Sequence, residues 1–355
     1  MSVGQVFPDQ YHSLLQDKIA LVNSQFAEDG LVLPTPTVYE SEVSHYRMRA
    51  EFRVWHEADD SFYIMFNPET KERIRMDEFP VGSALINTLM TQVRDAFMAD
   101  PILRRKLYQV EFLTTTTAQA LVSMIYHRPL EDDWLEKAQQ LEKDLGVHII
   151  GRSRKQKIVV SQNWVEETFT LNDGVYTYHQ YENTFTQPNA GVATHMLQWA
   201  VDQAASLEGD LLELYCGIGN FTLPLSRQFD AVTATEISKL STKAATENAA
   251  LNGCDNIQFL KASSEDFSAH WLKTDRTESA LDTLFVDPPR AGLDPATLDL
   301  ARHFKNIIYI SCNPETLRAN CAALSDAYDI QQFACFDQFP YTHHLECGAL
   351  LIRKS

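Results

Sequence analysis

The second half of the chain alternates short apolar segments with helical ones, and this rhythm constrains the fold more than any other feature. Strand-like segments lie at 210–217, 231–238, 256–263, 283–290 and 306–313. Helical stretches, such as 239–252 and 314–326, separate most of them. This alternation predicts a parallel sheet covered by helices on both faces. Two last strands, 332–337 and 348–354, have no helix-length segment between them, so we expect an antiparallel end to the sheet.

The first half of the chain reads as mixed α and β. Expected helices lie at 8–26, 81–98 and 131–145, and expected strands at 46–57, 61–68, 107–117, 147–153 and 155–162. The segment 46–57 alternates apolar residues (Ala50, Phe52) with charged ones (Arg49, Arg53), as a half-buried strand does. With 355 residues, the chain is long enough for about two domains. We place the boundary near residue 186.

Net charge gives a mixed indication about partners. A value of −18 counts against nucleic acid, because phosphate binding needs Lys and Arg. The first half nevertheless gathers its positive charge into short basic strips: Arg47, Arg49 and Arg53; Lys71, Arg73 and Arg75; Arg104, Arg105 and Lys106; Arg152, Arg154, Lys155 and Lys157. If these strips converge on one face, local potential outweighs net charge. The alternative, separate solvated charges, stays open.

Targeting and cysteine patterns indicate a soluble cytoplasmic protein. No apolar run approaches the roughly 20 residues that span a bilayer, and the first residues lack the pattern of a signal peptide. All six cysteines lie at or after Cys216, and none forms a Cys-x-x-Cys pair. Zinc-ribbon and iron–sulfur sites are therefore disfavoured, and the cysteines are expected to be reduced thiols.

A Gly-x-Gly turn in the segment 212–221 (LELYCGIGNF) indicates a nucleoside site. The turn follows an expected strand, and its glycines let the backbone approach a ligand closely. Glu236 ends the next strand, 19 residues after Gly217, where an acid can accept hydrogen bonds from ribose hydroxyls. The third glycine of a dinucleotide fingerprint is Thr222 here, which disfavours NAD. A simple tight turn remains the alternative.

Two further strands end in residues that carry chemistry. The segment VDPPR puts Asp287 and Arg290 on a stiff loop at the carboxyl edge of the sheet. A stiff turn with a solvent-exposed Asp is the alternative interpretation. Cys312 lies at a strand-to-helix junction, so its thiol is a candidate for a lowered pKa; a buried core cysteine is the alternative. Glu346 follows two adjacent histidines. Those histidines point different ways and lack a third ligand, which disfavours a metal.

Together these stretches resemble the RNA uracil-C5 methyltransferases, and the resemblance covers nearly the whole chain. It rests on SHYRMRAEFRVWH (44–56), ENTFTQPN (182–189), LELYCGIGNF, DPPR, SCNPETL (311–317) and FDQFPYTHHLECG (336–348). The chain is most similar to the bacterial tRNA type, which makes ribothymidine in the T-loop. The ribosomal-RNA relatives usually carry an extra β-barrel and a cysteine-ligated iron–sulfur cluster. The absence of any cysteine before Cys216 favours tRNA.

The resemblance implies a domain organisation and a cofactor. Residues 1–186 would form an N-terminal α+β domain that binds tRNA. Residues 187–355 would form a Rossmann-like class I methyltransferase domain with a mostly parallel seven-stranded sheet. The methyl donor would be S-adenosylmethionine, without a metal or an iron–sulfur cluster, and the enzyme would act as a monomer. A ribosomal-RNA methyltransferase and a non-catalytic RNA-binding factor with a retained cofactor pocket are the competing interpretations.

The resemblance also implies roles for single residues in methylating C5 of the T-loop uridine of tRNA (m5U54) and of T-loop-like RNAs such as tmRNA. Cys312 would be the nucleophile that adds to C6 of uracil, and Glu346 the base that removes the C5 proton. The expected cofactor contacts are Gln187, Tyr215, Gly217, Asn220, Glu236 and Asp287. The expected RNA contacts are Arg47, Arg49, Arg53, Tyr108, His127 and Arg290.

Overall fold

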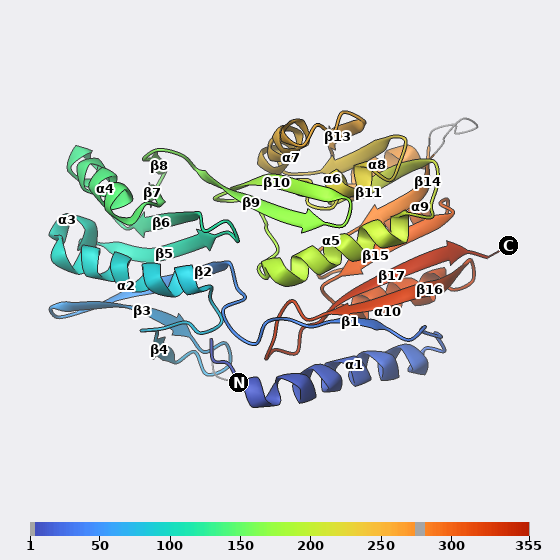
Figure 1. The fold of residues 1–355 in the computed structure, drawn as a ribbon, viewed down its shortest axis with the longest axis horizontal. Helices are drawn as coiled ribbons and strands as arrows, with labels where there is room; N and C mark the ends of the chain where they lie inside the picture. The colour runs from blue at the N-terminus through green and yellow to red at the C-terminus, as the bar shows by residue number, and fades with distance from the viewer. Residues whose placement is uncertain (1–3, 274–280, 355) are drawn as a thin grey trace. The chain divides into compact units, whose positions relative to one another are not determined.

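The computed structural model describes residues 4–273 and 281–354, and their contacts divide the chain into two compact units (Figure 1). The first unit comprises the residues up to Pro8, Glu42–Thr168 and His179–Ala190. The second takes Asp9–Ser41, Phe169–Tyr178 and Gly191–Ser355. Among the described residues, no helix has the length and apolar character needed to cross a membrane.

The first unit is built on a seven-stranded sheet in the order β4-β3-β2-β5-β6-β7-β8. Its strands are β2 (Arg49–Glu57), β3 (Asp60–Phe66), β4 (Arg73–Arg75), β5 (Leu107–Thr114), β6 (Ala120–Tyr126), β7 (His148–Ser153) and β8 (Gln156–Val159). All neighbours are antiparallel except β6 and β7. Its helices are α2 (Ala84–Ala99), α3 (Pro101–Arg104) and α4 (Asp132–Leu145).

Alternation along β2 decides which face of this sheet is buried. Ala50, Phe52 and Val54 are buried, whereas Arg53 between them is exposed, as the sequence pattern predicts. Helix α2 packs on β3 and β5, and its Phe97 meets the ring of Tyr63 edge-on. The face that carries Arg53 therefore looks away from α2.

The second unit is built on an eight-stranded sheet in the order β1-β16-β17-β15-β14-β11-β12-β13. Its strands are β1 (Thr37–Tyr39), β11 (Asp210–Leu214), β12 (Val232–Glu236), β13 (Ile257–Lys261), β14 (Leu281–Val286), β15 (Asn306–Ser311), β16 (Tyr328–Phe336) and β17 (Glu346–Arg353). Only β17 runs antiparallel to its neighbours, β15 and β16. The antiparallel end predicted from the sequence is confirmed.

Helices surround this sheet, and most begin with the capping residues that the sequence supplies. They are α1 (Tyr11–Glu28, after a 3₁₀ turn at Pro8–Gln10), α5 (Ala190–Ala204), α6 (Thr222–Ser226), α7 (Lys239–Leu251), α8 (Ser264–Trp271), α9 (Pro295–Ala301) and α10 (Pro314–Leu324). At the start of α10, the Asn313 side chain accepts from the Glu315 N–H, and Pro314 occupies the first helical turn. This cap fixes the backbone directly after Cys312.

A hairpin of β9 (Trp164–Leu171) and β10 (Gly174–Tyr181) forms a separate two-stranded sheet, and its residues are divided between the two units. The two units do not divide at a single boundary near residue 186. Residues 9–41 belong to the second unit, because β1 pairs with β16 and α1 packs on α10. The added strand β1 makes eight strands where seven were expected.

Candidate active site

The Gly-x-Gly turn follows β11 and leaves space beside its backbone. Gly217 has φ +56° and Gly219 has φ +86°, values that L side chains rarely adopt. A Cβ added at Gly217 would meet no atom within 4 Å, so the room beside this glycine is open. Tyr215 adopts φ +64° although it is not glycine. Such strain persists where surrounding structure enforces it, and it clusters at ligand sites.

Two backbone amides orient the carboxylate of Glu236 at the end of β12. Its Oε2 accepts from the Gly217 N–H at 3.1 Å, and its Oε1 accepts from the Ser238 N–H at 2.7 Å. The structure thus brings Glu236 and Gly217 together, as predicted. Asn220 lies in the same turn, where its carbonyl accepts from the Tyr178 hydroxyl at 2.9 Å.

Asn220 also supplies a test of whether this turn suits a polar ligand. Its buried Nδ2 has no hydrogen-bond acceptor among the residues that the structure describes. A buried donor without a partner costs about 1–3 kcal/mol, so an acceptor from a bound molecule would be stabilised there. This amide, the open side of Gly217 and the oriented Glu236 carboxylate fit an adenosine-type ligand.

The strand register places Cys312 beside Glu346. Ser311, the last residue of β15, pairs with Cys347 of the antiparallel strand β17. The next position of that ladder brings Cys312 to the level of Glu346. Asp287 directly follows β14, which lies on the other side of β15 and runs parallel to it. A thiol and two carboxyl groups therefore gather at one end of three neighbouring strands.

Burial dominates the electrostatics of this cluster. Glu346 is 3% exposed, and its Oε2 has no hydrogen-bond partner among the described residues. Burial raises the pKa of Glu346 well above its usual range; Asp287 raises it further, and Arg290 opposes the shift. The pKa of Asp287 is raised by burial as well.

The thiol of Cys312 shows the opposite of the expected shift. Burial, followed by the charges of Glu346 and Asp287, raises the pKa of Cys312 to about 11, although Arg290 lowers it in part. We expected a lowered pKa from the helix N-terminus. That prediction was wrong, because one helix end contributes less here than desolvation and two carboxylates.

Arg290 lies at the rim of a cavity of about 310 Å³ that Cys312 also lines. Its Nη2 is 3.0 Å from Nε2 of His344, and its carbonyl accepts from the Asn313 side chain at 3.0 Å. Burial and the charge of Arg290 lower the pKa of His344 to about 4. His344 is therefore neutral near pH 7 and can accept a hydrogen bond from Arg290.

A buried lysine, which the sequence analysis missed, holds the loop that precedes Glu346. Lys18 of α1 donates to Asp337 Oδ1 at 2.5 Å and to the carbonyls of Phe339 and His344 at 3.3 and 3.0 Å. Lys18 and Asp337 are 9% and 1% exposed. The sequence does contain one signal for this buried lysine: Lys18 lies on the same helix face as the apolar residues Leu15 and Ile19.

Replacing Lys18 with methionine is expected to lower the free energy of unfolding by about 3–5 kcal/mol, because it leaves the Asp337 carboxylate buried and unpaired. Urea denaturation of the full chain measures this change. Lys243→Met is the matched control; Lys243 forms an exposed ion pair with Glu247 and should change stability by under about 1 kcal/mol. Equal stability of the two variants would contradict the prediction.

Among the predicted RNA contacts of the first unit, Arg47 and Arg49 have structural partners. Arg49 donates to the carbonyls of Thr184 at 2.7 Å and Glu182 at 2.5 Å, and Arg47 Nε donates to the carbonyl of Arg49 at 2.8 Å. Burial lowers the pKa of both guanidinium groups. Arg49 supports the 182–184 segment and Arg47 supports the backbone of Arg49, and phosphate binding by either arginine stays a prediction.

Arg53, Tyr108 and His127 form one stack in the first unit. The Arg53 guanidinium lies 4.1 Å from the centroid of the Tyr108 ring, and the Tyr108 and His127 rings stack with centroids 3.9 Å apart. The structure thus brings these three predicted RNA residues together. Gln187 lies in the first unit, between β10 and α5, and its predicted cofactor contact stays a prediction.

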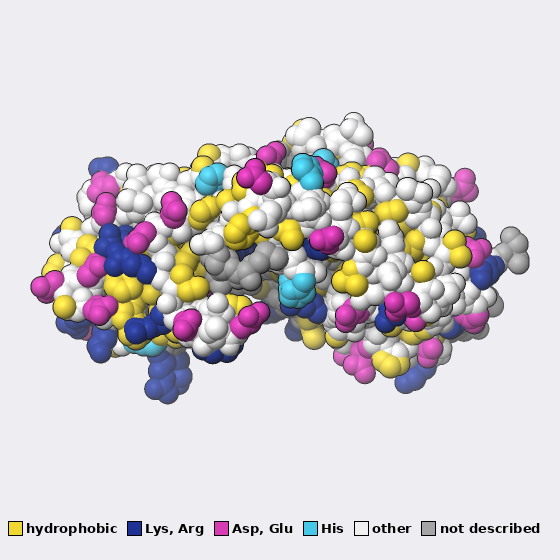
Figure 2. All heavy atoms as spheres, turned by 90° about the horizontal axis from the view of Figure 1, so that it is seen from below, with side chains coloured by type: hydrophobic (Ala, Val, Ile, Leu, Met, Phe, Trp, Pro, Cys, Tyr) yellow, Lys and Arg dark blue, Asp and Glu magenta, His cyan; other side chains and the backbone are white. Residues whose placement is uncertain are grey.

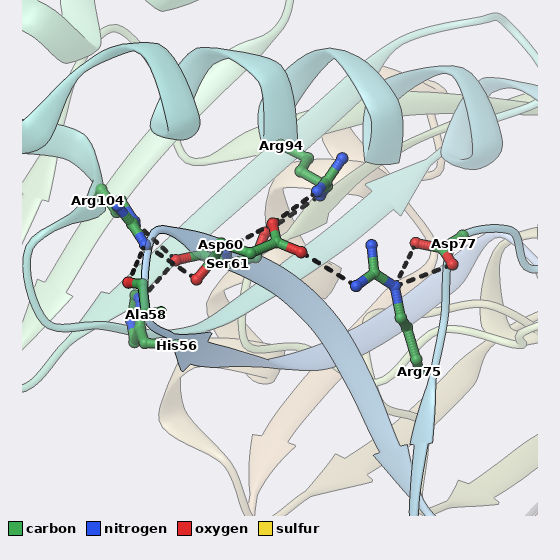
Figure 3. A network of polar contacts seen from close by, with 8 residues as sticks. All are labelled: His56, Ala58, Asp60, Ser61, Arg75, Asp77, Arg94 and Arg104. Atoms are coloured by element: carbon green, nitrogen blue, oxygen red, sulfur yellow. Dashed lines mark hydrogen bonds and ion pairs between the residues drawn. The ribbon is translucent and has the colours of Figure 1, made fainter.

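Three cations of the basic strips form ion pairs with carboxylates of the first unit, and a fourth donates hydrogen bonds to neutral groups. Figure 3 shows Asp60 between Arg94 and Arg75, and Arg75 also binds Asp77. Arg104 donates to Ser61 Oγ at 2.7 Å, which ties α3 to β3. Arg152 and Lys157 likewise bind the buried carboxylate of Glu182. These four side chains tie neighbouring segments of the first unit together, and convergence of the other cations on one face stays a prediction.

Metal ligation finds no support in the part of the chain that the structure describes. No group of three or more His, Cys, Asp or Glu side chains is arranged there to hold an ion.

The family model described as tRNA (Uracil-5-)-methyltransferase matches residues 10–354. The chain belongs to this family. The prediction of an RNA uracil-C5 methyltransferase is thereby confirmed at the level of the family and its enzyme class.

Relatives of this methyltransferase match along their whole length. Proteins described as tRNA/tmRNA (uracil-C(5))-methyltransferase are 48% identical in Marinomonas sp. (strain MWYL1), with 100% of both chains covered, and 49% identical in Cellvibrio japonicus, with 97% and 96% covered. A crystal structure of the Pyrococcus abyssi tRNA (uracil-54, C5)-methyltransferase in complex with S-adenosyl-L-homocysteine aligns with a TM-score of 0.74 at 20% identity, covering 96% of this chain and 83% of that one. The predicted α/β methyltransferase fold is confirmed.

Proposed function

We propose that this methyltransferase uses S-adenosylmethionine to methylate C5 of the T-loop uridine of tRNA, with Cys312 as nucleophile and Glu346 as base. The observation that carries the proposal is the pairing of Ser311 with Cys347, next to which Cys312 and Glu346 lie close enough for the Glu346 charge to raise the pKa of the Cys312 thiol. The names of the relatives support tRNA and tmRNA as substrates. The uracil-54 enzyme of Pyrococcus abyssi, bound to S-adenosyl-L-homocysteine, supports the position and the cofactor.

The chemistry explains why a thiol and a carboxyl group are both needed. C5 of uracil is too weak a nucleophile to take a methyl group unaided, so the Cys312 thiolate first adds to C6 and moves an electron pair into the ring. C5 then attacks the methyl group that S-adenosylmethionine supplies on its sulfonium. Glu346 removes the remaining C5 proton, the C5–C6 double bond reforms, and the bond from C6 to sulfur breaks.

The remaining residues bind and orient. Glu236, Asn220 and Gly217 suit the adenosine part of the cofactor, and Tyr215, Asp287 and Gln187 complete the proposed contacts. Arg290 stabilises negative charge on the Cys312 sulfur and at the uracil edge. The target base leaves its stack to reach the thiol, which is easier from a loop than from a duplex.

The first unit is the proposed platform for the T-arm, acting in a cytoplasmic monomer. Tyr108 and His127 provide faces for base stacking, and Arg53 provides a cation beside them. Arg47 and Arg49 would contact phosphates through the guanidinium N–H groups that do not donate to backbone carbonyls. Loss of T-arm affinity on replacing Arg53 would agree with this assignment.

Methyl transfer is expected to rise with pH between about 6 and 9. The reactive form of Cys312 is the thiolate, and a pKa raised to about 11 keeps the thiol protonated across this range. Each pH unit then yields about tenfold more thiolate. The raised pKa of Glu346 acts in the same direction, because a base must be deprotonated. Single-turnover rates at saturating tRNA measure the profile; a flat profile would contradict it.

The decisive experiment follows labelled methyl from S-adenosylmethionine into unmodified tRNA, tmRNA and ribosomal-RNA transcripts, and then maps the product nucleoside. Label recovered as 5-methyluridine in the T-loop of tRNA is the expected result. Label that enters only ribosomal RNA would replace the proposed substrate. No label in any transcript would favour an RNA-binding role without catalysis.

A further inference from the structure

The outer face of β2, β3 and β4 carries aromatic side chains that the methylation chemistry does not use. Trp55 pairs across the strands with Phe62, and both lie on the face of the sheet opposite Tyr63 and α2. Phe66 follows at the end of β3, opposite Arg73 of β4. Trp55 is 37% exposed and Phe66 is 45% exposed, whereas Ile64 between them is buried and forms the floor.

Arginines cover these rings in a regular way. The Arg73 guanidinium reaches over β3 to lie 4.1 Å from the centroid of the Trp55 ring, and Arg75 lies 4.3 Å from that of Phe62. Two adjoining hollows, of about 620 and 210 Å³, share Trp55 and Arg73 in their linings. We call this surface, made by Trp55, Phe62, Phe66, Arg73 and Arg75, the Trp55–Arg73 groove.

The two arginines of the groove differ in their ion pairing. Arg75 is held by Asp77 and Asp60, so its charge is largely compensated (Figure 3). No ion pair is recorded for Arg73 within residues 4–273 and 281–354, and its cation rests only on an aromatic face. Figure 2 shows hydrophobic side chains bordered by Lys and Arg at the left of the view, where the first unit lies.

We propose that the Trp55–Arg73 groove binds an unpaired stretch of the RNA substrate, with bases stacking on Trp55 and Phe66 and a phosphate on Arg73. The proposal rests on the proposed function in taking RNA as the substrate, and it adds a contact surface separate from the uridine site. Exposed rings offer sequence-tolerant stacking, and a base stacked on an aromatic side chain is worth about 1–3 kcal/mol. A duplex hides its base faces, so it fits the groove poorly.

The charge of the rim and the arginine on the indole ring favour RNA over a lipid surface for this groove. Glu57 and Glu72 lie in the lining of the hollows, next to Arg73, Arg75 and Lys71. A mixed rim of this kind does not suit an anionic membrane, which needs a polybasic surface. The Arg73 guanidinium has no carboxylate partner among the described residues and lies on the Trp55 indole ring. A nucleotide could therefore place its phosphate on the guanidinium and its base on a neighbouring ring.

Binding of a labelled adenine decamer to the full chain tests the proposal, because an RNA without uridine leaves the proposed uridine site unoccupied. Fluorescence anisotropy gives the Kd, in a Cys312→Ala background that forms no adduct. Trp55→Ala is expected to weaken binding on the order of 10-fold, and Trp55→Phe, which keeps a ring, by about twofold or less. Arg73→Ala is expected to weaken binding and to reduce the salt slope by about 0.7.

Controls separate the groove from general charge and from folding. Arg105→Ala removes an exposed arginine of the same unit and should leave the Kd unchanged. A GC duplex of equal length should bind at least 10-fold more weakly than the decamer. Equal decamer binding by Trp55→Ala, Arg73→Ala and the background protein would overturn the proposal. A wild-type chain that methylates no tRNA but loses decamer binding with Trp55→Ala would overturn the proposed function alone.

Discussion

Replacing Cys312 with alanine is expected to lower the rate of methyl transfer to tRNA by on the order of 10⁴-fold or more. The thiolate is what makes C5 nucleophilic, and no neighbouring thiol can replace it. Cys321, Cys335 and Cys347 are buried and have no access to a bound base. Binding of tRNA and of the cofactor should persist, because Cys312 forms its bond to the base only after the base has entered the site.

Single-turnover transfer of labelled methyl measures this loss, and tRNA binding is measured in parallel by anisotropy. Cys254→Ala is the matched control, since Cys254 is a partly exposed cysteine in the turn between α7 and β13 and makes only weak contacts with backbone carbonyls. It should retain wild-type rates. Substantial transfer by Cys312→Ala would show that the ring is activated without a covalent adduct.

The sheet of the second unit was largely predictable, because its strands are buried and their apolar pattern is strong. Strands β11 to β15 appear within a few residues of the expected segments. Strand β1 was missed because it has only three residues, Thr37–Tyr39, directly after two prolines, and it exists through pairing with the distant strand β16. Local periodicity carries no information about such a partner, and for the same reason it cannot show that residues 9–41 join the second unit.

In the site, too, features set by nearby sequence could be predicted, whereas features set by distant residues could not. Motifs pointed to Glu236, Cys312 and Glu346 as candidates, because each lies at or next to the end of a strand in a recognisable segment. The pKa of Cys312 was predicted in the wrong direction, because the neighbours that raise it arrive through sheet register and not through sequence proximity. Lys18 and Asp337 are 319 residues apart, so their pairing has no local signature.

The basic strips show how charge counts mislead when partners are unknown. The sequence displays Arg75 and Arg104 as available cations, whereas the fold surrounds them with Asp60, Asp77 and the Ser61 hydroxyl (Figure 3). Arg73, which belongs to the same strip, lies on Trp55 instead. Arg73 and Arg75 lie on the same side of β4, so the carboxylates that the fold brings near each arginine decide whether it is ion-paired.

Replacing Glu346 with glutamine is expected to lower turnover by about 10²–10⁴-fold and to leave the enzyme covalently joined to methylated RNA. The Cys312 thiolate can still add to C6, and C5 can still take the methyl group. Without a carboxylate, the C5 proton stays in place, so the double bond cannot reform and the bond from C6 to sulfur is retained. Glutamine matches the size of Glu346, which limits damage to its buried position.

A denaturing gel with methyl-labelled cofactor detects the joined species as a band that contains both protein and RNA. Glu315→Gln is the matched control, because Glu315 is an exposed carboxylate at the start of α10 that lines the same cavity as Cys312. It should turn over normally and accumulate no complex. The double variant Cys312→Ala, Glu346→Gln should form none either, because the sulfur is missing. Free methylated product from Glu346→Gln at wild-type rates would assign proton removal to another group, and Asp287, the other carboxyl at this edge of the sheet, would be the first to replace.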